Sequence, residues 1–301
     1  MQQPIPLQKG DLIALSAPAR KISPEELQFA IQKIEEAGFR IKIDERLFAS
    51  ENQFAGDDSI RAALLQDLLD DPEVKAVLFV RGGYGSLRII DRLDFSGFVQ
   101  SPKWLVGYSD ITVIHAKAQQ LGIQSLHASM PINFENNTDE SLQSLFDALQ
   151  NQAKPITFDA HPLNKTGVVK AEVVGGNLST LFSLLGSDLF PETSGKILFL
   201  EDLDEYLYHI DRMMLALKRA GKLNNLAGLL IGGMTDMNDN TIPFGKTAEE
   251  IIAEHVSEFD YPACFGFPAG HINDNRAICL GGSLSLKIER NQAIVTARKL
   301  T

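Results

Sequence analysis

Short apolar runs and segments with helical spacing alternate along the first half of the chain. The run DLIALS at 11–16 is followed by a capping box made by Ser23 and Glu26, with proline at the first helical position. Apolar residues at 27, 31 and 34 then recur at helical spacing, and Gly38 closes this segment before the strand-like FRIKI. The pattern predicts a strand, a helix and a second strand in succession.

The same unit recurs further along the first half. Apolar residues at 60, 64 and 68 predict a second helix, and the runs AVLFV (76–80), WLVG (104–107) and IQSLH (123–127) predict three more strands. Strands that alternate with helices indicate a mostly parallel sheet covered on both faces. We therefore expect an α/β domain over residues 1–152.

Regular patterning lapses in NQAKPITFDAHPLNKT (151–166), which contains two prolines. We interpret 153–166 as a linker and 167–301 as a second domain. Strand-like runs in this part occupy 167–177, 196–200, 226–233, 284–288 and 293–297, and helical segments begin at 209 and about 247. The higher β content predicts a smaller, barrel-like or mixed α/β domain.

Composition narrows the class of protein further. A chain of 301 residues, 44% apolar and 22% charged, is typical of a globular protein with two modest domains. Its formal net charge of -11 argues against nucleic acid as the partner. The first residues lack the basic start and continuous apolar core of a signal peptide, and no stretch is apolar enough to span a bilayer. We expect a cytoplasmic protein without a membrane partner.

The two cysteines, Cys264 and Cys279, form no CxxC pair and lie apart in the sequence. A disulfide or a zinc site is therefore not expected, and both residues are interpreted as buried thiols.

Candidate chemistry is sought in the loops after the strands, because ligands of open parallel sheets bind beyond the carboxyl ends of the strands. The turn RGGYG at 81–85 follows one predicted strand, and its glycines leave backbone N–H groups free to approach a ligand. By itself the turn is more simply a tight strand-to-helix connection. It matches neither the P-loop pattern nor the dinucleotide-binding pattern.

Ser109 lies in KWLVGYSDIT, between a predicted strand and a predicted helix, which is the context of a nucleophile elbow. The local sequence GYSDI departs from GxSxG, and a Ser-Asp pair is also an ordinary helix start, so this motif alone favours a helix cap. The two interpretations differ in geometry. A cap directs Oγ to the N–H of Ile111 or Thr112, whereas a nucleophile directs it to a base.

A serine nucleophile needs a base, normally histidine, and a group that orients the base. Among six histidines, His271 lies in the Gly- and Pro-framed loop FGFPAGHINDN, a better place for a base than a helix surface. His127 ends a strand at the functional edge of the sheet. Glu201 is the first carboxylate after the apolar run KILFL, whereas the acidic residues that follow it (Asp202, Asp204 and Glu205) suit a solvated loop.

Several segments together resemble the LD-carboxypeptidases, a family of serine peptidases that trim murein tetrapeptides. They are GDLIALSAPA, VRGGYGSLRIIDRLDF, KWLVGYSDIT, VVGGNLSTLFSLLGS, ILFLEDLDEYLYHIDRMMLALKRAG and GFPAGHINDN, which cover nearly the whole chain in order. The resemblance implies an amino-terminal domain similar to class I glutamine amidotransferases and a smaller, barrel-like carboxyl-terminal domain. It also implies a homodimer that uses no cofactor and no metal.

Carried over to the matching positions, the resemblance makes Ser109 the nucleophile, Glu201 the orienting acid and His271 the base. The backbone N–H groups that it places at the oxyanion belong to three residues: Gly82, Gly83 and Asp110. The implied reaction removes the terminal D-alanine from murein tetrapeptide during peptidoglycan recycling. The nucleophile then comes from the first domain and its two partners come from the second.

A carboxypeptidase must also recognise a free terminal carboxylate, a task that suits the planar fork of an arginine. Three arginines lie close to the motifs above: Arg81, Arg88 and Arg276. An internal ion pair is the commoner use of any one of them. Our candidates for substrate binding are Arg81, Tyr84 and His127.

Two other functions fit the same fold. Relatives that inactivate peptide–nucleotide antibiotics use the same three residues but carry extra loop sequence, which this compact chain lacks. A muropeptide-binding module would have kept the fold and lost the chemistry, yet all three catalytic positions are filled with competent residues. A dehydrogenase is disfavoured because the first turn, SAPARKISPEE, contains no glycine.

Overall fold

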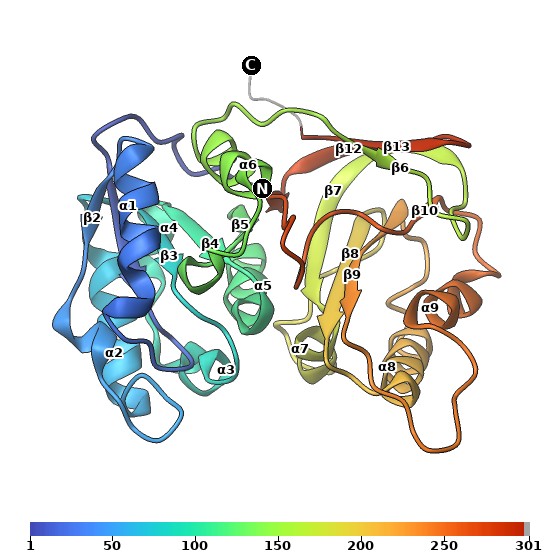
Figure 1. Ribbon diagram of the computed structural model, residues 1–301, viewed down its shortest axis with the longest axis horizontal. Coiled ribbons are helices and arrows are strands. Elements are labelled where there is room, and N and C mark those ends of the chain that lie inside the picture. The colour runs from blue at the N-terminus through green and yellow to red at the C-terminus, as the bar shows by residue number, and fades with distance from the viewer. Residues whose placement is uncertain (298–301) are drawn as a thin grey trace.

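The computed structural model describes residues 1–297 and contains two sheets, which lie beside each other in Figure 1. The first sheet has six strands, in the spatial order β11 (Ile278–Leu280), β5 (Ser125–His127), β4 (Trp104–Gly107), β3 (Val74–Phe79), β1 (Leu12–Ser16) and β2 (Arg40–Lys42). All neighbours pair in parallel except β11, which pairs antiparallel with β5. The mostly parallel sheet predicted for the first half is confirmed.

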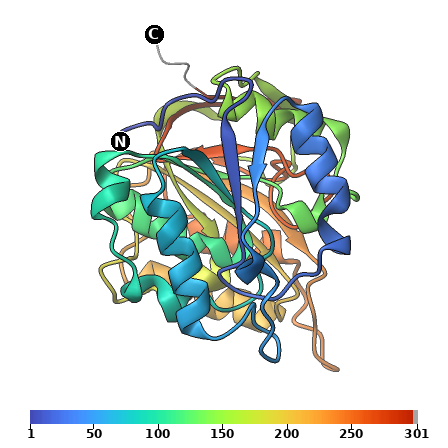
Figure 2. The same ribbon diagram turned by 90° about the vertical axis from the view of Figure 1, so that its left-hand side faces the viewer.

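Six helices accompany this sheet: α1 (Gln28–Glu36), α2 (Asp58–Asp70), α3 (Ser86–Ile89), α4 (Ser96–Gln100), α5 (Thr112–Gln120) and α6 (Asp139–Leu149). Figure 2, turned so that this half faces the viewer, shows them around its strands. The predicted capping box is present, since the Ser23 N–H donates to Glu26 Oε2 at 2.8 Å and the Glu26 N–H donates to Ser23 Oγ at 3.4 Å. Strands β1, β3 and β4 are almost wholly buried, which explains their continuous apolar runs, whereas the edge strand β2 has one exposed and two half-buried residues.

The second sheet has seven strands, in the order β10 (Ala263–Cys264), β9 (Gly228–Thr235), β8 (Ile197–Leu203), β7 (Gly167–Asn177), β12 (Ser283–Ile288), β13 (Gln292–Ala297) and β6 (Ile156–Asp159). It is mixed, because β10 to β7 pair in parallel and β7 to β6 pair antiparallel. Its helices are α7 (Leu178–Ser183), α8 (Leu207–Arg219) and α9 (Ala248–Val256). A mixed α/β second part is confirmed.

Strand β6 lies within the segment that the sequence predicts as a linker. Its four residues alternate between half-buried and exposed positions and pair with β13. A strand this short, preceded by Pro155, carries too few apolar positions to show a period. The polypeptide therefore joins the second sheet well before residue 167.

The two halves are held together by shared strands and helices. Strand β11 comes from the second half of the sequence but extends the first sheet through β5. Helix α5 of the first half contacts β7, and its Ala116 belongs to the core built by α7 and α8. The Asn177 N–H at the end of β7 donates to Thr112 Oγ1 at 3.0 Å. A site that takes residues from both halves would therefore lie at a packed interface.

Further expectations concern the cysteines, metal sites and membrane-spanning helices. Cys264 is buried and Cys279 is half-buried, and both are free thiols. Within residues 1–297, no His, Cys, Asp or Glu cluster has the arrangement of a metal site. A search of the same residues also finds no helix with the length and apolarity needed to cross a membrane.

A substitution at Gly175 tests the close pairing of strands β7 and β8. The pairing aligns Gly175 with Phe199 and Asn177 with Glu201, and a Cβ at Gly175 would lie 1.9 Å from the Phe199 carbonyl oxygen. Gly175→Ala is therefore expected to lower the free energy of unfolding by at least about 3 kcal/mol, because backbone atoms must move. Urea denaturation followed by circular dichroism measures this loss.

The matched control is Gly245→Ala, where φ is also positive at +86° but no atom lies within 4 Å of the added Cβ. Its cost is expected to be about 1–2 kcal/mol, which is the cost of the left-handed backbone alone. Equal losses in the two variants would contradict the steric account of Gly175.

Candidate active site

The carboxyl ends of the parallel strands in the first sheet bring several predicted residues to one edge. The predicted turn 81–85 follows β3, and the predicted Ser109 follows β4. Arg20, which was not a candidate in the sequence analysis, lies in the loop after β1. His127 is the last residue of β5. This edge is where an open parallel sheet binds its ligands.

Ser109 adopts a strained backbone conformation and does not cap the helix that follows. Its φ of 64° is in the left-handed region, which is uncommon for a residue other than glycine. The Ile111 N–H bonds to the Tyr108 carbonyl at 3.2 Å, and the Thr112 N–H bonds to the carbonyls of Ser109 and Asp110. The helix-cap interpretation, which the local motif favoured, is therefore wrong. A strained turn between strand and helix has the geometry of a nucleophile elbow.

Gly82 leaves the space beside the Ser109 hydroxyl open. A Cβ at Gly82 would lie 3.2 Å from Ser109 Oγ and 3.1 Å from Ser109 Cβ. Gly83, at φ +107°, has a backbone that only glycine adopts readily. Within residues 1–297, the N–H groups of Gly82 and Gly83 donate no hydrogen bond. Two unused backbone donors thus lie next to the serine.

Two buried charged side chains brace these turns. Asp110 Oδ2 accepts a hydrogen bond from the Ser86 N–H at 2.9 Å, which joins the serine turn to the start of α3. Burial raises the pKa of Asp110, although the hydrogen bonds from Ser86 act in the opposite direction. Arg61 of α2 donates to the carbonyls of Pro18 at 2.5 Å and Gly85 at 3.1 Å, so it ties the first loop to the glycine turn. The role of Arg61 was not foreseen from the sequence.

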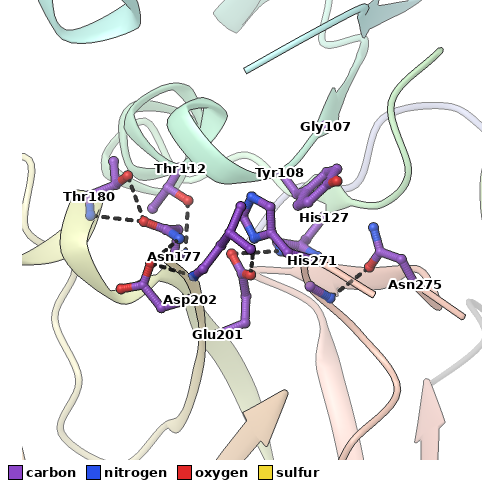
Figure 3. Close-up of polar contacts among 12 residues, drawn as sticks. Gly107, Tyr108, Thr112, His127, Asn177, Thr180, Glu201, Asp202, His271 and Asn275 are labelled. Atoms are coloured by element: carbon purple, nitrogen blue, oxygen red, sulfur yellow. Dashed lines mark hydrogen bonds and ion pairs between the residues drawn. The ribbon is translucent and has the colours of Figure 1, made fainter. Parts of the chain in front are cut away.

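Glu201 and His271 form the central polar pair, shown in Figure 3. His271 Nδ1 and Glu201 Oε2 are 2.7 Å apart, and the Glu201 side chain is fully buried. Glu201 lies where the pairing of β8 with β9 shifts register, and such irregularities redirect side chains. Gly270 is required beside the pair, because a Cβ there would lie 2.7 Å from Glu201 Oε2.

His127 lies on the other side of the same carboxylate. It is fully buried, and its Nε2 is 3.9 Å from Glu201 Oε1, a distance longer than a hydrogen bond. Neither ring nitrogen of His127 has a hydrogen-bond partner among residues 1–297. The structure therefore places His127 inside the protein beside Glu201, and contact of His127 with a substrate stays a prediction.

The electrostatics follow from this burial. Burial alone would raise the pKa of Glu201, but His271 and His127 lower it to about 2. Burial alone would lower the pKa of His271, but the Glu201 carboxylate outweighs it, and the net direction is upward. The pair is thus held with Glu201 ionised and with Nδ1 of His271 committed to Glu201. The other ring nitrogen, Nε2, makes no hydrogen bond within residues 1–297.

Asp202 corrects the expectation of a solvated acidic loop. It is 1% exposed and belongs to β8, where its carboxylate accepts hydrogen bonds from the Asn177 side chain at 2.8 Å and the Ser179 N–H at 2.8 Å. Burial, reinforced by the neighbouring Glu201 carboxylate, raises the pKa of Asp202 to about 7. Asp204 is exposed as expected, and Glu205 pairs with His209 at 2.5 Å.

Tyr108 joins the serine turn to the histidines. Its ring centroid is 4.7 Å from that of His271 and 5.7 Å from that of His127, and its hydroxyl donates to Asn133 Oδ1 at 3.0 Å. Ser109 is the next residue, although within the described chain no hydrogen bond joins Ser109 Oγ to His271. Such bonds are often long in unliganded enzymes and tighten with substrate.

The loop that carries His271 is fixed to the first half of the protein. It connects β10 of one sheet to β11 of the other. The Thr138 N–H donates to the Asn273 carbonyl at 3.0 Å, and Ser141 Oγ donates to the Asn275 carbonyl at 2.8 Å. The start of α6 therefore sets the position of the histidine loop.

The three candidate arginines are all engaged with carboxylates. Arg81 is 3.5 Å from Glu26, Arg88 is 2.8 Å from Asp58, and Arg276 pairs with Asp274. The expectation of internal ion pairs is therefore met at all three positions. Tyr84 is 48% exposed beside the glycine turn.

The fold and this arrangement place the chain in a class of two-part α/β proteins with serine, histidine and glutamate at the junction. Family models of the LD-carboxypeptidase N-terminal domain and C-terminal domain match residues 11–128 and 170–286. The probable murein peptide carboxypeptidase of Bacillus subtilis is 34% identical over 98% of this chain and 94% of its own length. The chain therefore belongs to the LD-carboxypeptidase family.

Other relatives agree with this assignment. The murein tetrapeptide carboxypeptidase of Pseudomonas aeruginosa is 27% identical over 92% of this chain and 94% of its own. The crystal structure of muramoyltetrapeptide carboxypeptidase from Oxalobacter formigenes has a TM-score of 0.85 at 26% identity, covering 95% of this chain and 98% of that one. The microcin C7 self-immunity protein has a TM-score of 0.87 at 20% identity, with 98% of each chain covered, which shows the shared fold alone.

The Glu201 carboxylate gives a testable pH dependence. If His271 is the base, kcat/KM for peptide hydrolysis falls as the pH drops through the raised pKa of His271, because the protonated ring cannot accept a proton. Glu201→Gln removes the group that raises this pKa. The acid inflection is expected to move to lower pH, and the plateau is expected to fall by about 10⁴-fold because the tautomer is no longer held.

The control is Glu205→Gln, which removes a carboxylate that pairs with a different histidine, His209. It should leave both the inflection and the plateau unchanged. An acid inflection that stays in place in Glu201→Gln would show that Glu201 does not set the pKa of the base.

Proposed function

We propose that this protein is a serine LD-carboxypeptidase that removes the terminal D-alanine from murein tetrapeptide, L-Ala-γ-D-Glu-meso-diaminopimelate-D-Ala, in peptidoglycan recycling. The observation that carries the proposal is the 2.7 Å hydrogen bond between His271 and the buried Glu201, in a chain of the LD-carboxypeptidase family. The names of the relatives in Bacillus and Pseudomonas support murein peptide as the substrate.

In the first step of the proposed mechanism, Ser109 Oγ attacks the carbonyl of the L-configured centre of the diamino acid. His271 Nε2 accepts the hydroxyl proton, and Glu201 holds the ring and stabilises the imidazolium. The strained backbone of Ser109 supports this role, because it holds the hydroxyl away from the helix that follows. No cofactor or metal takes part in the proposed reaction.

The negative charge that develops on the carbonyl oxygen requires backbone donors. We assign this role to the N–H groups of Gly82, Gly83 and Asp110, of which the first two are unused within residues 1–297. Loss of one such donor typically costs about 100- to 1000-fold in kcat. His271 then gives its proton to the departing D-alanine, and water hydrolyses the acyl-enzyme.

Further residues complete the proposed site. Tyr84 and Arg81 border the glycine turn and are proposed to line the substrate. His127 is buried beside Glu201, which supports a part in holding that carboxylate.

The wider organisation is part of the same proposal. We place an amino-terminal domain similar to class I glutamine amidotransferases at 1–152 and a barrel-like domain at 167–301, joined by a linker at 153–166 that contributes β6 to the second sheet. A bridge between Lys165 and Ala263 supports partial closure of the second sheet, because it links the chain after β6 to β10. A cytoplasmic homodimer is the proposed state.

Replacement of the serine tests the proposal directly. Wild-type protein is expected to release D-alanine from the tetrapeptide, and Ser109→Ala is expected to reduce kcat by more than about 10³-fold while leaving the fold intact. D-Alanine is measured by a coupled oxidase assay and the fold by circular dichroism. Ser101→Ala, at an exposed position, serves as the control. No release by the wild type, or undiminished release by Ser109→Ala, would overturn the proposal.

The same preparation distinguishes the alternative substrates. Hydrolysis of an aminoacyl-sulfamoyl adenylate faster than of the tetrapeptide would favour antibiotic inactivation. Tight binding of the tetrapeptide without turnover would favour a muropeptide-binding module. We expect turnover of the tetrapeptide to be the fastest of these reactions.

A further inference from the structure

The substrate proposed above ends in a carboxylate, and this inference rests on that proposed function. The carboxyl groups of Glu201, Asp202 and Asp110 are all buried near the site. The terminal carboxylate of a substrate would add a further negative charge beside these groups. It needs a cation as a partner, because charges in a partly desolvated site interact strongly. The cations expected from the sequence are already engaged, since Arg81, Arg88 and Arg276 each contact a carboxylate of the protein.

Arg20 differs from those three arginines. Within residues 1–297, its guanidinium has no carboxylate within 4.0 Å and makes no hydrogen bond, and the residue is exposed. Its stem nevertheless has a defined place. A Cβ at Gly83 would lie 2.5 Å from Arg20 Cδ and 3.1 Å from Arg20 Nε, so the stem occupies the space that this glycine leaves open.

The backbone of Arg20 is also held at the site. Its N–H donates to the Gly82 carbonyl at 3.4 Å, and the residue forms an antiparallel bridge with Phe54. The loop before it is tied to the glycine turn by Arg61, which donates to the carbonyls of both Pro18 and Gly85. Arg20 is thus an exposed side chain on a fixed base, and less conformational freedom is lost when it binds a ligand.

Ser109 and Arg20 lie beside neighbouring residues of the glycine turn. Ser109 Oγ lies 3.2 Å from a Cβ placed on Gly82, and Arg20 Nε lies 3.1 Å from a Cβ placed on the next residue, Gly83. Consecutive Cα atoms are about 3.8 Å apart, and a terminal amino acid extends about 3.5 Å past the bond that is cleaved. The serine hydroxyl and the Arg20 side chain therefore border adjacent residues of the same turn, so a short peptide end bound there can reach both.

We propose that Arg20 binds the terminal carboxylate of the peptide and thereby restricts the enzyme to free carboxyl ends. The guanidinium offers two parallel N–H donors to the two carboxylate oxygens, a geometry that an ammonium group cannot reproduce. The neighbouring cation, Lys21, is directed elsewhere, since its Nζ donates to Ser50 Oγ at 3.1 Å.

The experiment compares two substrates, the tetrapeptide with a free carboxyl end and the same peptide ending in D-alaninamide. Release of D-alanine or D-alaninamide is measured by chromatography for the wild type, Arg20→Ala and Arg20→Lys. The wild type is expected to prefer the free acid. Arg20→Ala should lower kcat/KM for the acid by about 10- to 100-fold and leave the amide unchanged, so that the preference disappears. Arg20→Lys should restore only part of it.

Arg40→Ala is the matched control. Arg40 lies on β2 and is also exposed, but its side chain is engaged, because its Nε donates to the Gly10 carbonyl. It should keep the full preference, and thermal unfolding of all variants should match the wild type. An Arg20→Ala enzyme that still prefers the acid, or that loses both substrates equally, would overturn the assignment of Arg20. A wild type that cleaves neither peptide would instead overturn the proposed function.

Discussion

The arrangement of the site depends on one buried carboxylate, that of Glu201. Glu201 has no contact with solvent, and an ionised group in that position is costly unless it is paired. His271 supplies the pairing from a loop that reaches it from between the two sheets. The register shift in β8 and the absence of a side chain at Gly270 both make room for this contact. Both members of this pair come from the second half of the chain, and the first half holds the loop that carries His271 through the bonds of Thr138 and Ser141.

A second set of buried charges organises the opposite side of the site. Asp110 and Arg61 each bond to backbone groups in the loops that follow parallel strands. Loops are otherwise the most mobile parts of an α/β fold. These bonds give the serine turn and the glycine turn fixed positions while leaving the N–H groups of Gly82 and Gly83 unused.

Much of the fold could be predicted from the sequence, because buried parallel strands are continuous apolar runs and the helices between them carry clear signals. The short strands β6, β10 and β11 were not predicted, because they lie outside the regular alternation of strands and helices that identified the others. Positions after strands and in a Gly- and Pro-framed loop made Glu201 and His271 candidates, and the family resemblance assigned their roles. The local motif pointed instead to a helix cap at Ser109. A local motif does not reveal the positive φ of Ser109, because this angle depends on how the chain passes from β4 to α5.

Other features depend on contacts that no local pattern contains. Asp202 sits in an acidic run that suits a solvated loop, yet the paired strands bury it against Asn177. Arg61 lies on a helix that was predicted from its apolar residues alone. Two of the carbonyl groups to which it donates, those of Pro18 and Gly85, are 43 and 24 residues away in sequence. Arg20 became distinguishable from the other arginines only when their partners were known.

The antiparallel pairing of β11 with β5 also limits how the protein can move and be divided. The segment after His271 completes the first sheet, so the two halves cannot swing apart like a hinge without breaking strand hydrogen bonds. Peptides must then enter and leave through local loop movements. For the same reason, a fragment that ends near residue 150 would expose the edge of β5, which invites aggregation. The chain is expected to unfold as one cooperative unit, even though its core is built in two places.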